Sequence, residues 1–183
     1  MAWKLLSREY LFRRPPWLTV RHDSLQLPNG NIIPDFYVME YPDWVNIIPI
    51  TEDGKFVMVT QYRHGLGRVL TELPSGVLEE TDVSPLAGAQ RELLEETGYG
   101  GGEWTELVKI SANAGSTNNI THCFLARGVK LTGPQKLDSG EDLTCTLLTE
   151  EEIKEMLLRG EIVQSLEAAP LWQYFALKTW NKL

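Results

Sequence analysis

Residues 76–99 read GVLEETDVSPLAGAQRELLEETGY, and this stretch predicts one capped helix near the middle of the chain. Ser84 followed by Pro85 is typical of an N-cap and a first helical position, and Gly98 can supply the left-handed stop. Apolar residues between these caps are predicted to form one buried face, made of Leu86, Ala87, Ala89, Leu93 and Leu94. The stretch therefore predicts an amphipathic helix with its other face presented.

Three glutamates, Glu92, Glu95 and Glu96, occupy positions i, i+3 and i+4, which share that presented face. Two carboxylates about 5.5 Å apart repel by about 3 kcal/mol at an effective dielectric near 20. A bound divalent cation would turn this repulsion into attraction, because hard oxygen ligands suit Mg²⁺ or Mn²⁺. Arg91 stands four residues before Glu95 and is predicted to pair with it. Taken alone, the run also fits a solvated acidic face of an ordinary helix.

Residues 91–99, together with Gly76, resemble the Nudix box, a loop–helix–loop with the pattern R-E-apolar-x-E-E-x-G-apolar. The resemblance implies that the protein binds divalent metal and hydrolyses a nucleoside diphosphate linked to another group. The front of the box departs from the family pattern, because its loop is one residue longer and Val83 stands where a glutamate is expected. The acids that remain as candidates for the outer metal shell are Glu79, Glu80 and Asp82.

Length and composition fit one compact enzyme domain with a small appendage, since the chain has 183 residues, 43% of them hydrophobic. The net charge of −8 argues against nonspecific binding to nucleic acid or to an anionic membrane. No apolar run approaches the length of a membrane span, and early charges do not fit a secretory signal. Cys123 and Cys145 are predicted to be reduced, buried thiols, so the expected location is cytoplasmic.

The order of strand and helix patterns predicts an α/β fold with a mixed sheet sandwiched between helices. Residues 1–43 are predicted to be a β-rich N-terminal region, and residues 44–183 the Nudix domain. The predicted strands are Trp17–Leu25, Ile32–Tyr41, Val45–Ile50, Lys55–Tyr62, Trp104–Ile110, His122–Ala126 and Leu143–Leu148. Beyond the central helix, two more are predicted, over Thr149–Gly160 with a capping box and over Pro170–Trp180.

Four further segments are similar to the ADP-ribose pyrophosphatase branch of the Nudix family. They are Val59–Arg63 (VTQYR), Glu72–Gly76 (ELPSG), Ala114–Thr117 (AGST) and Leu157–Ile162 (LLRGEI). In that branch the N-terminal strands form a small domain that is exchanged between the two subunits of a homodimer. The resemblance therefore implies a homodimer in which residues 1–43 take this role.

The same resemblance implies roles for individual residues. The implied ligands of two or three Mg²⁺ or Mn²⁺ ions are the Ser75 carbonyl and the carboxylates of Glu92, Glu95 and Glu96. Glu141, in an acidic loop late in the chain, is the preferred general base, with a box glutamate as the alternative. The other predicted site residues are Arg91 and Glu96 in catalysis, and Arg63, Glu72 and Gly76 in substrate binding.

Three functions are compatible with these patterns. The first is hydrolysis of ADP-ribose to AMP and ribose 5-phosphate. The second keeps the chemistry but changes the substrate to another nucleotide sugar or dinucleotide, such as GDP-mannose, NADH or a flavin dinucleotide. The third is a non-catalytic sensor of a nucleotide metabolite. Retention of Glu92, Glu95 and Glu96 speaks against the sensor, which has no need of a metal-binding face.

Overall fold

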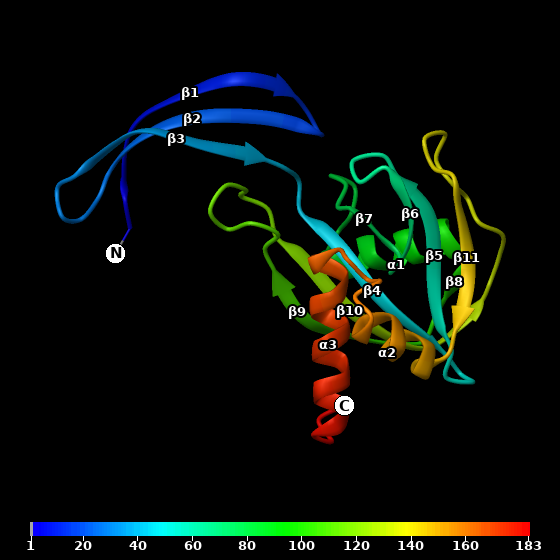
Figure 1. The fold of residues 1–183 in the computed structure, drawn as a ribbon. Helices are drawn as coiled ribbons and strands as arrows, with labels where there is room; N and C mark the ends of the chain where they lie inside the picture. Colours follow the sequence, from blue (N-terminus) through cyan, green and yellow to red (C-terminus); the bar gives the residue numbers. More distant parts are fainter. Residues whose placement is uncertain (1) are drawn as a thin grey trace. The chain divides into compact units, whose positions relative to one another are not determined.

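A computed structural model describes residues 2–183, which fold into a small antiparallel sheet, a larger mixed sheet and three helices (Figure 1). The helices are α1 (Pro85–Thr97), α2 (Glu150–Leu158) and α3 (Ser165–Thr179). The strands are β1 (Lys4–Arg14), β2 (Leu18–Gln26), β3 (Ile32–Glu40), β4 (Trp44–Thr51), β5 (Phe56–Arg63), β6 (Arg68–Glu72), β7 (Ser75–Val77), β8 (Tyr99–Gly100), β9 (Glu103–Ile110), β10 (Thr121–Leu131) and β11 (Leu143–Leu148).

The chain divides into two compact units. The first reaches to Asp43 and also takes in Ser111–Ile120, a loop from the middle of the sequence. Backbone contacts explain this grouping, because the Met39 amide donates to the Ser116 carbonyl at 2.8 Å. The second unit contains Trp44–Ile110 and Thr121–Leu183, and it holds all three helices.

The first unit is an antiparallel sheet in the order β1-β2-β3. The strand pattern of the sequence indicated β2 and β3 but missed β1, where charged and aromatic residues do not alternate with the period of a half-buried strand. Every residue of β1 is exposed within the single chain. An ion pair ties the sheet together, since the exposed Arg8 donates from Nε to Oδ1 of the buried Asp23 at 2.8 Å.

The second unit is built on a mixed sheet whose central order is β11-β5-β4-β10-β8. Strands β4 and β10 run parallel, whereas β5 and β11 are antiparallel to their neighbours. The short strands β6 and β7 extend the sheet beside β5 and β4, and β9 pairs with β10. The predicted mixed sheet is therefore confirmed, with three short strands, β6, β7 and β8, that the sequence patterns did not indicate.

Two apolar cores lie on opposite faces of this sheet, one with residues of α1 and the other with residues of α2 and α3. On β4, Val45 and Ile47 point toward α1, whereas Ile48 and Ile50 belong to the core shared with α2 and α3. This alternation follows from the two-residue period of a strand, and it makes β4 apolar on both faces. The helices therefore sandwich the sheet, as predicted from the sequence.

Helix α3 begins at Ser165, five residues before the predicted start at Pro170. Proline was taken as a first helical residue, but it lies inside the helix, where it cannot donate to the carbonyl four residues back. That carbonyl belongs to Leu166, and the Asn46 side-chain amide donates to it at 2.8 Å. A tertiary hydrogen bond from β4 thus replaces the missing helical one, which no local pattern could reveal.

Within residues 2–183, no helix is long and apolar enough to cross a membrane. Cys123 is buried and Cys145 half-buried, and both are free thiols. Burial raises the pKa of the Cys123 thiol to about 12, so this side chain is an inert part of the apolar interior.

Candidate active site

Helix α1 has the predicted caps but not the predicted buried face. The Ser84 hydroxyl accepts from the Ala87 amide at 3.1 Å, and Gly98 ends the helix with φ of 74°. However, Glu92 and Glu96 are only 8% and 3% exposed, and Leu94 is 38% exposed. The expectation of a presented glutamate face opposite a buried apolar one is therefore wrong. The sheet and its loops cover two of the three glutamates, a tertiary effect that helical periodicity does not report.

Arg91 donates hydrogen bonds to several of the groups around these glutamates. Its Nη1 donates to Glu92 Oε1 at 2.8 Å and to Glu95 Oε2 at 3.0 Å, which confirms the predicted pair with Glu95. Its Nε donates to Asp82 Oδ1 at 3.1 Å and its Nη2 to Asp82 Oδ2 at 2.8 Å, and Nη2 also donates to the Val77 carbonyl. One guanidinium therefore connects the loop before α1 to the acidic side chains on it.

The lengthened loop before α1 places Asp82 against Arg91. The Arg91 guanidinium lowers the pKa of the Asp82 carboxyl, and the Glu79 amide also donates to it. Val83, at the position of the missing acid, is 92% exposed. Glu79 and Glu80 are exposed as well. Of the three acids considered for an outer metal shell, Asp82 thus serves to anchor Arg91.

Glu96 reaches under the short strand β7, where its Oε2 accepts from the Ser75 amide at 2.9 Å. Glu92 lies against Gly76, since a Cβ added at that glycine would come within 2.1 Å of the Glu92 carboxyl carbon. The missing side chain at residue 76 therefore leaves the space that the Glu92 carboxylate occupies. The structure thus brings together Ser75, Gly76, Glu92 and Glu96, while Glu95 stands half-buried beside Arg91.

Burial dominates the protonation of the two inner glutamates. Desolvation raises the pKa of Glu92 to about 7, against the opposing charge of Arg91. It also raises the pKa of Glu96 to about 8, although the Ser75 amide favours the charged form. The negative charge of Glu141 contributes to raising both pKa values, which places this loop residue near the two glutamates. Arg63 opposes the rise at Glu96.

A hollow of about 510 Å³ is lined by Arg63, the residue whose charge acts on Glu96. Arg63 ends β5, and its Nε donates to Glu72 Oε2 at 2.7 Å, so the terminal amino groups are left for another acceptor. The residues lining the hollow are Trp44, Gln61, Tyr62, Arg63, His64, Gly65, Leu66, Gly140 and Gln164. Glu141 follows Gly140, and its carboxylate accepts from the Asp138 amide at 2.9 Å. A guanidinium, two aromatic rings and an acidic loop thus surround one space.

The donor set of the cluster fits a divalent cation. Glu92 and Glu96 are buried carboxyl groups whose charged forms are disfavoured by desolvation, and a divalent cation would compensate that cost with oxygen ligands that suit it. In residues 2–183, no three His, Cys, Asp or Glu side chains are already grouped as a metal-ligand set. Hydrogen bonds to Arg91 and to the Ser75 amide hold the two carboxylates instead.

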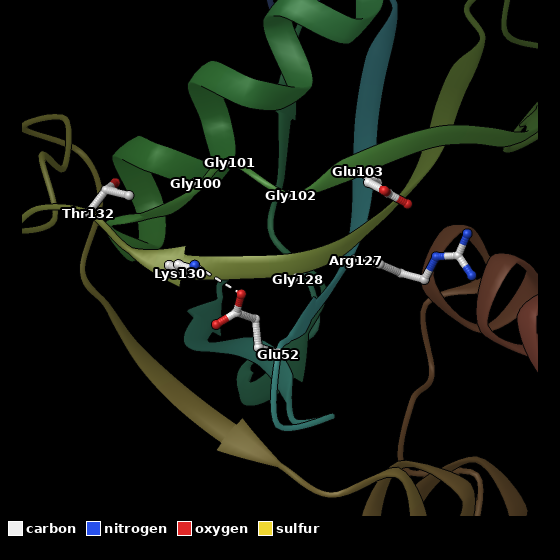
Figure 2. A pocket seen from close by; sticks show the side chains of 9 residues that line it. All are labelled: Glu52, Gly100, Gly101, Gly102, Glu103, Arg127, Gly128, Lys130 and Thr132. Atoms are coloured by element: carbon white, nitrogen blue, oxygen red, sulfur yellow. Dashed lines mark ion pairs between the residues drawn. The ribbon is translucent and has the colours of Figure 1, made fainter.

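A second hollow, of about 760 Å³, contains none of the predicted site residues (Figure 2). Its floor is the glycine run Gly100–Gly102, and Lys130 pairs with Glu52 across it at 2.9 Å. The Arg127 side chain extends away from that pair in Figure 2. Because these charges are already matched or directed elsewhere, this hollow adds nothing to the chemistry of the glutamate cluster.

Sequence reasoning missed two residues that the structure places close to the site. Glu167 of α3 is 0% exposed, and Asn46 of β4 is 2% exposed. Each was a polar residue in an otherwise apolar segment, which was the available signal. Neither segment matched a motif, so these residues could not be linked to the glutamate helix before the tertiary structure was known.

Buried carboxylates beside an arginine-lined hollow are typical of hydrolases that act on phosphate anhydrides with metal ions. Comparison with known proteins agrees. A model described as the NUDIX domain matches residues 40–168, and one described as the nucleoside diphosphate sugar hydrolase N-terminal domain matches residues 3–39. The chain belongs to the Nudix family, which confirms the family and the enzyme class predicted from the sequence.

Two curated relatives are named ADP-ribose pyrophosphatase. The one from Mycobacterium tuberculosis is 34% identical over 161 residues, covering 87% of this chain and 77% of the relative. The one from Bacillus subtilis is 31% identical over 176 residues, covering 96% and 93%. A crystal structure described as an ADP compounds hydrolase superposes with a TM-score of 0.83 at 22% identity, over 100% of this chain and 98% of that one. This structure supports the fold.

Proposed function

We propose that this protein hydrolyses the pyrophosphate bond of ADP-ribose to give AMP and ribose 5-phosphate. The observation that carries the proposal is the pair of buried carboxyl groups of Glu92 and Glu96, on which the charge of Glu141 acts, together with Arg63, which acts on Glu96 and lines a hollow with Gly140. The two relatives named ADP-ribose pyrophosphatase support this choice of substrate over other nucleoside diphosphates.

In this proposal the residues divide the work of binding and proton transfer. Arg63 holds a phosphate oxygen with the amino groups that Glu72 does not engage, and Trp44 or Tyr62 stacks on the base. Glu141 accepts a proton from the attacking water with Oε1, the oxygen that the Asp138 amide does not engage. Arg91 orients Glu92 and Glu95, and Gly76 keeps the approach to Glu92 open.

Glu92, Glu95, Glu96 and the Ser75 carbonyl are the proposed ligands of two or three Mg²⁺ or Mn²⁺ ions. When bound, such ions neutralise the pyrophosphate and lower the pKa of a water molecule. The need for a cation is consistent with the net charge of −8, because an acidic protein must bring positive charge to an anionic substrate.

The direct test is a panel of nucleoside diphosphate compounds, with phosphate release coupled to a phosphatase and products separated by chromatography. We expect ADP-ribose with Mg²⁺ to have the highest kcat/KM and to yield AMP, and EDTA to abolish turnover. Faster hydrolysis of GDP-mannose, NADH or a flavin dinucleotide would move the proposal to that substrate. Tight binding of a panel member without turnover, in the presence of Mg²⁺ or Mn²⁺, would make the protein a sensor.

We also propose that the active form is a cytoplasmic homodimer joined through the exchanged residues 1–43, with residues 44–183 as the catalytic domain. The support is the surface of the β1-β2-β3 sheet, where β1 has no buried residue in the single chain. Its exposed large apolar side chains include Trp3, Leu5, Leu6, Tyr10, Leu11, Phe12 and Trp17. Many exposed large apolar side chains in one short segment usually mark a protein contact.

Light scattering during gel filtration is expected to give about twice the chain mass of 20.8 kDa. Replacing Leu11 and Phe12 by Glu places two negative charges on β1. The protein should shift to the monomer, because burying these carboxylates in the dimer contact costs free energy. The matched control replaces Leu158 by Glu, an exposed apolar residue on α2. A wild-type chain that elutes as a monomer at micromolar concentration would contradict the dimer.

A further inference from the structure

The first turn of α3 is bound to β4 and to the backbone directly after β6. Glu167, with no exposed surface, lies at the centre of this contact. Its Oε2 accepts from the Leu73 amide at 2.8 Å. Its Oε1 accepts from Asn46 Nδ2 at 3.4 Å and from Gln164 Nε2 at 3.3 Å. One side chain of the C-terminal helix therefore holds the backbone directly after β6 and a side chain of β4.

Glu72, the residue before Leu73, is the partner of Arg63. It is 2% exposed, and its Oε2 accepts from Arg63 Nε at 2.7 Å. Its other oxygen, Oε1, is the buried side-chain acceptor within residues 2–183 that has no hydrogen-bond partner. A buried polar atom left in this way costs free energy, so the surroundings must hold Glu72 in place against that cost.

Two buried carboxyl groups, those of Glu72 and Glu167, interact with a single positive charge, that of the Arg63 guanidinium. Burial raises the pKa of Glu167 to about 8, and the nearby charge of Glu72 adds to the rise, while Arg63 opposes it. The Leu73 amide, in contrast, favours the charged form of Glu167, to which it donates.

Both ends of this buried network reach the proposed substrate hollow. Arg63 lines the hollow from the end of β5, and Gln164 lines it from the residue before α3. Gln164 is attached to Glu167 directly, and Arg63 is attached through Glu72. Displacing Glu167 would thus loosen two parts of the wall that faces the substrate.

We propose that Glu167 is a positioning residue for the hydrolytic reaction. It fixes the Glu72–Leu73 backbone from α3 and, through Glu72, holds the Arg63 guanidinium where it binds the phosphate of the substrate. The inference rests on the proposed function, since it takes Arg63 as a substrate contact. The C-terminal helix thereby takes a part in substrate affinity.

The test compares Glu167→Gln, Glu167→Asp and Glu167→Leu in the full-length protein. Gln keeps an oxygen for the Leu73 amide and is expected to retain the KM for ADP-ribose within about threefold, whereas Leu should raise it about tenfold. In Glu167→Asp the shorter side chain withdraws the carboxylate oxygen from the Leu73 amide but remains polar, so the KM of this variant should lie between those of the other two. The change is expected in KM more than in kcat, because Arg63 binds substrate in the ground state as well.

The matched control is Leu171→Ala, four residues further along α3, where the side chain is also 0% exposed. It should lower the Tm by at least as much as Glu167→Leu without raising the KM. In an Arg63→Ala background, Glu167→Leu should change the KM by less than about twofold, since the two act through one contact. A folded Glu167→Asp variant with the wild-type KM, or additive effects in the double variant, would overturn the inference.

A readout that needs no turnover separates this inference from the proposed function. The Arg63 Nε–H signal in NMR should exchange slowly with solvent in the wild type and in Leu171→Ala, and faster in Glu167→Leu or Glu167→Asp. A wild type that hydrolyses no panel member overturns the proposed function, and the Arg63 signal then decides whether Glu167 holds the guanidinium. Unchanged exchange in both Glu167 variants overturns the inference alone.

Discussion

Glu96→Gln is expected to lower kcat for ADP-ribose hydrolysis by about 10²–10³-fold, the effect typical of removing one preorganised charged group from a reaction centre. The carboxylate is proposed to bind metal, and an amide is a much weaker ligand for a hard cation. The fold should persist, because the Gln oxygen can still accept from the Ser75 amide. Steady-state kinetics with Mg²⁺, together with circular dichroism, check both parts.

The control for this substitution is Glu151→Gln on α2, which makes the same chemical change at an exposed acid far along the sequence from α1. It should leave kcat and KM as in the wild type. Glu92→Gln should resemble Glu96→Gln, since both carboxyl groups belong to the same buried cluster. Wild-type turnover by a folded Glu96→Gln variant would contradict the proposed metal role of this residue.

The metal-free protein is expected to lose stability as the pH rises. The pKa values of Glu92 and Glu96 are raised from 4.5 to about 7 and about 8, so the folded state holds protons that the unfolded state releases. Unfolding therefore becomes easier between about pH 4.5 and pH 8, by at most about 8 kcal/mol for the two groups together, since one pKa unit corresponds to about 1.4 kcal/mol. Thermal unfolding in EDTA at a series of pH values measures the slope.

Divalent ions should reverse this loss, because they bind the ionised carboxylates of the folded state only. The rise in Tm on adding Mg²⁺ or Mn²⁺ is expected to be larger at pH 8.5 than at pH 5.5. Glu96→Gln should flatten the pH profile in EDTA and weaken the response to metal. A wild-type Tm that is independent of pH across this range would show that neither glutamate is held in its neutral form by burial.

Local signals in the sequence predicted a large part of the fold. Ser84 and Gly98 cap α1 as expected, and Thr149 and Glu152 form the expected capping box of α2. These features depend on residues within one helical turn of each other, so they can be recognised without knowing the rest of the fold. The start of α3 could not be predicted in this way, because Pro170 is tolerated through a hydrogen bond from Asn46 to Leu166.

The candidate site likewise has features that local sequence predicts and features that depend on the tertiary structure. The sequence alone determined that Glu92, Glu95, Glu96 and Arg91 share one helix, because the i, i+3 and i+4 spacing is a property of the helix itself. Only the tertiary structure decided which of them are buried. Glu92 and Glu96 lie beneath the sheet and its loops, whereas Glu95 stays half-exposed. Burial, rather than charge spacing, raises their pKa values, and burial depends on segments distant in the chain.

The loop before α1 and the helix α3 show this dependence most clearly. The sequence showed that the loop is one residue longer than the family pattern and lacks an acid at Val83. The structure added that both oxygens of Asp82 accept hydrogen bonds from Arg91. It also brought Glu167 to the Leu73 amide, 94 residues away in the chain. A single sequence does not report such pairings, because each residue has no local signal and gains its role only when folding buries it beside partners from distant segments.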